Sequence, residues 1–68
     1  MTLEEKYKLA RKCIKINQLT YADVLLDLCL VDLAIATEKG VTKVGKVDVN
    51  LWKTRVWTTI EKAGLLPL

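Results

Sequence analysis

Residues 20–37 read TYADVLLDLCLVDLAIAT, and the architecture expected for the whole chain follows from this segment. Thr20 is a good helix N-cap and Asp23 occupies the third helical position, so we expect a helix over 20–37. This helix is apolar on nearly every side, which is typical of a central helix covered by its neighbours. Two neighbours cannot cover its whole circumference. The uncovered part predicts contact with another chain, and we expect a homo-oligomer, such as a dimer.

A first helix is expected over 2–16. Thr2 and Glu5 have the spacing of a capping box. One half of the helix is apolar at helical spacing: Leu3, Tyr7, Leu9, Ala10, Cys13, Ile14 and Ile16. The other half carries the bases Lys8, Arg11, Lys12 and Lys15. Two interpretations of this basic half are open, a solvated face or a patch that meets phosphate or an acidic protein.

A third helix is expected over 49–63, after a cap at Asp48 or Asn50. Its apolar stripe has the spacing of a buried face: Val49, Trp52, Val56, Ile60 and Ala63. Trp52 is therefore predicted to pack inside. Trp57 falls on the flank of the stripe, next to Lys53.

The third helix is expected to end at Gly64, and the residues after it indicate a reversal of the chain. Leu65 and Leu66 are predicted to fold back, and Pro67 prevents the helix from continuing.

The segment 40–48 is predicted to be a partly extended loop that lies on the helices. Lys39 and Gly40 end the second helix. The valines at 41, 44, 47 and 49 favour extended backbone, and Gly45 suits a turn between two short strands. The whole chain, 1–68, is therefore expected to form one all-α, three-helix domain.

The residue inventory argues against catalysis and against a bound metal or cofactor. The chain of 68 residues has no His and no Ser, so a zinc site and the common acid–base and nucleophile sets are missing. We therefore expect a non-enzymatic protein with no cofactor and no small-molecule substrate. The longest apolar run is shorter than the ~20 residues that a membrane span needs. We expect a cytoplasmic protein whose Cys13 and Cys29 are reduced.

The net charge of +3 is distributed unevenly along the chain. Residues 1–18 and 38–68 each carry an excess of three positive charges, whereas 19–37 contains three aspartates and no base. This distribution permits contact with nucleic acid. Asp32 projects away from the other two aspartates. It is expected to lie at an edge, to pair with Arg55 or a lysine, or to contact a basic partner.

The loop and last helix together resemble a known structural class. The loop GVTxxG, from Gly40 to Gly45, precedes a helix with the pattern V-x-x-x-I-x-x-x-G-L-L, from Val56 to Leu66. Residues 36–66 are thereby similar to helix-turn-helix and winged-helix modules, to DNA-binding modules of site-specific recombinases, and to a small helical anti-sigma factor of T-even phages. The loop is longer than the 3–4-residue turn of a simple helix-turn-helix.

This resemblance implies a small transcriptional regulator of phage or mobile-element type that binds nucleic acid. In such a protein the third helix enters a groove. The residues that would face this groove of the nucleic acid are Lys53, Thr54, Trp57 and Thr58. Arg55 and Lys62 would reach the phosphates beside it. Further phosphate contacts are expected from Lys8, Arg11, Lys12, Lys15, Lys43 and Lys46.

Two other functions remain open on the sequence. One is a small inhibitor or adaptor that binds a host transcription or defence protein. Its contact surface would consist of Trp57, Arg55 and a strip of Leu26, Leu30 and Leu33. The other is a structural subunit whose only partner is itself.

Overall fold

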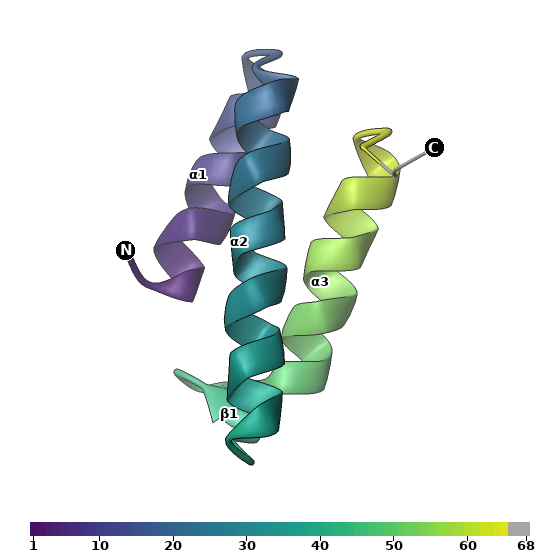
Figure 1. The fold of residues 1–68 in the computed structure, drawn as a ribbon. Helices are drawn as coiled ribbons and strands as arrows, with labels where there is room; N and C mark the ends of the chain where they lie inside the picture. The colour runs from purple at the N-terminus through teal and green to yellow at the C-terminus, as the bar shows by residue number, and fades with distance from the viewer. Residues whose placement is uncertain (66–68) are drawn as a thin grey trace.

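The computed structural model describes residues 1–65, and these form a three-helix domain with a small hairpin (Figure 1). The elements are α1 (Leu3–Lys15), α2 (Leu19–Glu38), β1 (Lys43–Val44), β2 (Val47–Asp48) and α3 (Val49–Lys62). The long α2 contacts both α1 and α3. The predicted all-α, three-helix fold is confirmed.

The start of α1 follows the predicted capping box. The Glu5 amide donates to the Thr2 hydroxyl at 3.2 Å, and the Thr2 amide donates to the Glu5 carboxylate at 3.2 Å. The hydrogen bonds that the Thr2 amide and the Thr2 hydroxyl donate to the Glu5 carboxylate lower the pKa of this carboxyl. Ile16 follows the helix as its C-cap and is 67% exposed, so it does not belong to the buried stripe.

All three helices end in the same way. The residue after the C-cap has a positive φ, namely 61° at Asn17, 75° at Gly40 and 71° at Gly64. The next amide then reaches back to the last turn, as from Gln18 to the Cys13 carbonyl at 2.8 Å. This is the Schellman motif, which satisfies carbonyls that a helix end otherwise leaves unpaired. The predicted stops at Gly40 and Gly64 are confirmed.

The predicted cap of α2 is wrong. The N-cap is Gln18, without a side-chain hydrogen bond, and Thr20 lies inside the first turn. The reason is the short connection, since the closing motif of α1 already includes Gln18 and the helix begins at the next residue. The connection between α1 and α2 therefore consists of Ile16, Asn17 and Gln18.

The loop between α2 and α3 contains a regular two-stranded hairpin. Lys43 pairs with Asp48 and Val44 pairs with Val47, around a turn in which Gly45 has φ 65°. The indole Nε1 of Trp52 donates to the Val44 carbonyl at 3.2 Å, which ties the hairpin to α3. Asp48 then caps α3 by accepting from the Asn50 amide at 2.8 Å.

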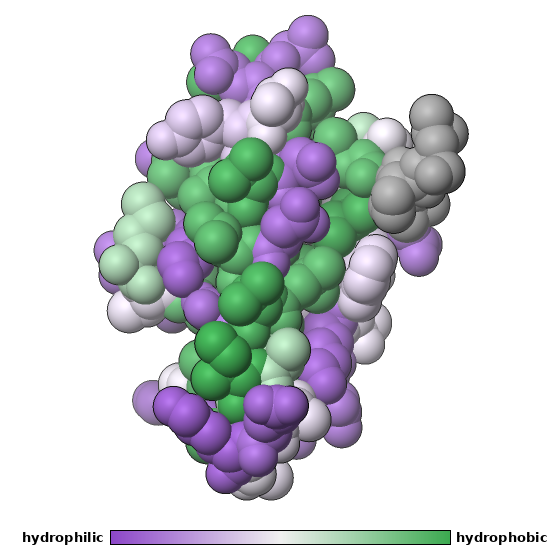
Figure 2. All heavy atoms as spheres, viewed as in Figure 1, coloured by the Kyte–Doolittle hydropathy of each residue, from purple (hydrophilic) through white to green (hydrophobic). Residues whose placement is uncertain are grey.

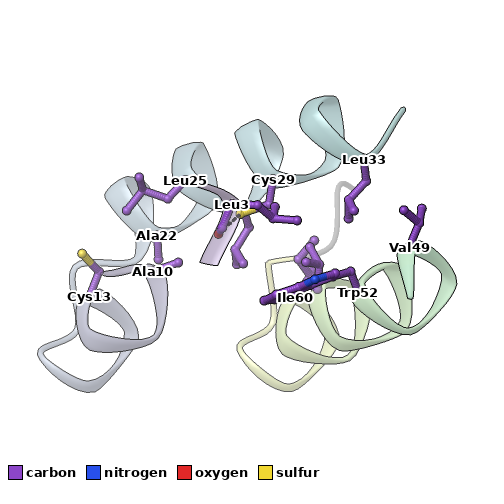
Figure 3. Close-up of a cluster of buried hydrophobic side chains, with 12 residues drawn as sticks. Leu3, Ala10, Cys13, Ala22, Leu25, Cys29, Leu33, Val49, Trp52 and Ile60 are labelled. Carbon is purple, nitrogen blue, oxygen red and sulfur yellow. Dashed lines mark hydrogen bonds between the residues drawn. The ribbon is translucent and has the colours of Figure 1, made fainter. Parts of the chain in front are cut away.

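The core lies where α2 faces α1 and α3 (Figure 3). Its buried members are Leu3, Ala10, Cys13, Ala22, Leu25, Leu26, Cys29, Leu33, Val49, Trp52, Val56 and Ile60. The predicted stripe of α3 is therefore confirmed, with Ala63 half-buried at its end. Leu65 packs against this core as predicted, whereas Leu66 and Pro67 lie outside the described residues.

Cys29 and Asp32 occupy the α1-facing side of α2. The Cys29 thiol donates to the Leu3 carbonyl at 3.9 Å, and burial, with the charge of Asp32 adding and that of Lys6 opposing, raises its pKa to about 11. Asp32 pairs with Lys6 at 2.7 Å, so of the partners predicted for it a lysine is the one present. Arg55 lies elsewhere, over the Trp52 ring.

Candidate nucleic-acid interface

A groove of about 440 Å³ runs between α1 and α3. Its lining residues are Tyr7, Arg11, Ile14 and Lys15 from α1, with Thr54, Arg55, Thr58, Thr59, Lys62 and Ala63 from α3 and its C-cap. At these positions the two helices are 39 residues or more apart in the sequence, since the nearest pair is Lys15 and Thr54. Their basic residues meet only because both helices pack against α2.

Tyr7 connects the two walls of the groove. Its hydroxyl and that of Thr59 share a hydrogen bond of 2.9 Å, and its ring meets Trp52 edge-on at 5.5 Å between centroids. The Thr59 hydroxyl donates its single proton to the Arg55 carbonyl at 2.8 Å, so Tyr7 must donate to Thr59. This contact fixes the spacing of α1 and α3.

Four cations surround the groove: Arg11, Lys15, Arg55 and Lys62. The lining residues include no carboxylate, and none of the four takes part in the ion pairs found among residues 1–65. Two of them lie over aromatic rings, with Arg11 5.9 Å from the Tyr7 centroid and Arg55 5.6 Å from the Trp52 centroid, and of these two rings the Tyr7 ring lines the groove. Cation–π contact orients the guanidinium groups without neutralising them. The groove therefore presents uncompensated positive charge.

The threonines give the groove hydroxyl groups beside these charges. Thr54 donates to the Asn50 carbonyl at 3.1 Å, which leaves its oxygen lone pairs as acceptors. Thr58 is exposed one turn further along α3. Guanidinium, ammonium and hydroxyl groups in one groove are suited to phosphate oxygens.

The predicted contact residues are divided among several surfaces. The groove brings together Arg11, Lys15, Thr54, Arg55, Thr58 and Lys62. Lys53 and Trp57 lie on the opposite flank of α3, in a recess shared with Leu30, Leu33, Ala34 and Thr37 of α2.

The remaining predicted bases lie outside the groove. Lys8 pairs with Glu4 at 3.3 Å on the surface of α1. Lys12 is exposed and does not line the groove, and Lys43 and Lys46 belong to the hairpin and its turn. Lys46 lines a separate recess together with Arg55, which is the one residue that this recess shares with the groove.

Two polar groove residues, Tyr7 and Thr59, were not predicted as site residues, and neither were the apolar Ile14 and Ala63. Tyr7 was assigned to the apolar stripe of the first helix, and Thr59 was not singled out. The available signal was the Tyr7 hydroxyl, because a half-buried tyrosine needs a hydrogen-bond partner near the edge of the core.

The leucine strip predicted for protein contact is wrong. Leu26 and Leu33 are 0% exposed and Leu30 is half-buried. They face inward because α1 and α3 pack against that side of α2. Trp57 is 43% exposed and remains available at the surface.

Within residues 1–65, no helix combines the length and the hydropathy that crossing a bilayer requires, and no cluster of three or more His, Cys, Asp or Glu side chains could hold a metal ion. No family model, curated protein or solved structure matches the chain. The resemblance of residues 36–66 to helix-turn-helix modules therefore stays a prediction.

Proposed function

We propose that the chain is a small nucleic-acid-binding protein whose α1–α3 groove contacts the phosphate backbone of duplex DNA. The observation that supports this proposal is the ring of Arg11, Lys15, Arg55 and Lys62 around a groove that no carboxylate of the described lining neutralises. A cationic groove of this kind attracts a polyanion, because binding releases the counterions condensed on the DNA.

The binding is expected to depend little on base sequence. The groove offers Thr54 and Thr58 between its cations, but the arginines lie over aromatic rings. Bidentate readout of guanine or adenine usually uses an arginine or an amide side chain that is free to reach a base edge. Regulation of transcription, the role implied by the resemblance of the loop and α3, is the finer part of this proposal.

The test measures binding of a fluorescently labelled DNA duplex by anisotropy at low salt. Arg11→Gln and Lys62→Gln each remove one groove cation from an exposed side chain, so the fold should be retained. Each is expected to weaken binding by roughly three- to tenfold, which is the effect of a phosphate contact worth about 1 kcal/mol.

The matched control is Lys12→Gln, which makes the same charge change on an exposed residue of α1 outside the groove. It is expected to bind nearly as tightly as the unchanged chain. If Lys12→Gln weakens binding as much as Lys62→Gln does, the positive charge acts diffusely and the groove is not the site.

A second candidate function is capture of another protein through Trp57. Its support is the exposed indole beside the recess formed with Ala34 and Thr37. Tryptophan is a favoured anchor of protein interfaces. A chain that binds no duplex even at low salt, but retains a protein partner that Trp57→Ala releases, would replace the first proposal with this one.

A further inference from the structure

The solvent-facing side of α2 carries a row of exposed apolar side chains, here named the α2 seam. Its members are Tyr21, Val24, Leu28, Val31 and Ile35, which are 43–60% exposed. Figure 2 shows the corresponding hydrophobic band over the face of α2 that is turned toward the viewer. The seam is distinct from the core face of α2, which contacts α1 and α3.

The spacing within the α2 seam is three, four, three and four residues. This is the a/d pattern of a heptad, in which apolar side chains recur every 3.5 residues. Such a pattern keeps a continuous stripe toward another helix that lies almost parallel or antiparallel to it. Tyr21 to Ile35 span about 21 Å at 1.5 Å per residue, long enough for two heptads of helix–helix contact.

The apolar area of the seam is sufficient for a dimer. An aromatic side chain has about 150–250 Å² of surface and an aliphatic one roughly half as much, so at these exposures the seam residues present roughly 300 Å², and Trp57, in the recess beside Ala34, adds roughly 100 Å². A standard interface buries about 800 Å² per partner, somewhat more than half of it non-polar. Pairing of the seam with a second α2 seam would bury a comparable apolar area.

The charges beside the seam select the orientation of the two copies. The flank toward α3 includes Ala34, which shares a recess with Lys53, and Asp27 lies about two helical turns before Ala34 on the same flank, next to the first half of the seam. Lys53 lies next to the second half of the seam. The flank toward α1 carries Asp32. In a parallel pair the two different flanks face each other, and Asp27 of one copy meets the Asp32–Lys6 ion pair of the other, so Asp27 gains no free cation.

An antiparallel pair gives Asp27 a cation. It sets the α3 flank of one copy against the α3 flank of the other in reverse order, so that each Asp27 faces the other copy's Lys53. The two-fold axis makes this contact twice. The antiparallel arrangement also opposes the two helix macrodipoles, which is the favourable direction.

We propose that the α2 seam binds the same seam of a second copy of this chain, with the two α2 helices antiparallel. The α1–α3 groove shares no residue with the seam, so a dimer leaves both grooves open. The proposal does not depend on nucleic-acid binding and is tested without nucleic acid.

The first test is the solution mass, measured by light scattering and sedimentation equilibrium over a wide range of concentration. The unchanged chain is expected to have twice its mass of 7.7 kDa. Leu28→Glu places a carboxylate at the centre of the seam and is expected to give a monomer. The matched control Leu51→Glu alters an equally exposed leucine of α3 outside the seam and should remain a dimer, with helical circular dichroism retained in both.

The second test reverses the charges at the seam's flank. Asp27→Lys and Lys53→Glu are each expected to weaken the dimer about tenfold, and the double variant should recover most of the loss. A double variant no tighter than the single ones overturns the antiparallel arrangement. The proposed interface is overturned if the chain stays monomeric at high concentration or if Leu28→Glu leaves the dimer intact. It is also overturned if the chain is a monomer whose seam binds a different protein.

Discussion

The number of cations in the α1–α3 groove predicts how strongly salt weakens DNA binding. Each phosphate neutralised contributes about −0.9 to the slope of log affinity against log salt concentration. With Arg11, Lys15, Arg55 and Lys62 each at one phosphate, the expected slope is roughly −3.6. Raising the salt from about 50 mM to about 200 mM should then lower the affinity about 150-fold.

Removing one groove cation should change the slope by a fixed amount. Lys62→Gln leaves three contacts, so the expected slope is roughly −2.7 and the same change in salt lowers the affinity only about 40-fold. Lys12→Gln should keep the slope of the unchanged chain, since Lys12 lies outside the groove. The slope therefore counts contacts, whereas a single affinity would also reflect a small loss of folded protein.

The assay is fluorescence anisotropy of a labelled duplex short enough to occupy one groove, titrated at four or more salt concentrations. Circular dichroism of each variant confirms that the helices are retained. The reasoning fails if the unchanged chain has a slope near zero, if Lys62→Gln leaves the slope unaltered, or if Lys12→Gln reduces it equally.

Three further predictions concern the stability of the fold. Leu33→Ala removes a fully buried side chain between α2 and α3. It should lower the free energy of unfolding, measured by urea titration, by about 3 kcal/mol. A loss below about 1 kcal/mol would mean that the site is loosely packed. Gly40→Ala meets no atom within 4 Å but forces alanine to a φ of 75°, so it should cost about 1–2 kcal/mol in the same titration, and an unchanged midpoint would argue against the left-handed helix end. Burial raises the folded pKa of the Cys29 thiol from 9.0 to about 11, so the unfolded chain loses this proton first and stability falls as the pH rises from about 9 to about 11. The loss should reach about 2–3 kcal/mol and be absent in Cys29→Ser, and equal alkaline losses in both chains would refute this assignment.

The positions of the helices could be predicted from local sequence signals. These signals are local, because each concerns hydrogen bonds within a few residues of one helix end. They are the Thr2 capping box, the Asp48 cap and the glycines at 40 and 64. The buried stripe of α3 was equally predictable, since its apolar residues occupy a single face. The start of α2 was less predictable. The Gln18 amide already bonds to the Cys13 carbonyl at the end of α1, so α2 begins directly after Gln18 rather than after Thr20.

Which surfaces are exposed depends on how the three helices pack. Because α2 is apolar on nearly every side, the spacing of its apolar residues does not indicate which side contacts α1 and α3. Packing buried Leu26 and Leu33 and left Val24 and Val31 exposed, contrary to the predicted leucine strip. The pairing of Lys6 with Asp32, 26 residues apart, was likewise one of several partners that the sequence allowed.

The basic residues show the same division. Their presence on the first and third helices could be read from the sequence, and so could their spacing along each helix. The meeting of Arg11 with Arg55 and Lys62 could not, because it depends on how both helices lie against α2 and on the hydrogen bond between Tyr7 and Thr59. Helical periodicity fixes which side chains share a face of one helix, whereas the packing of three helices fixes which faces form a common groove.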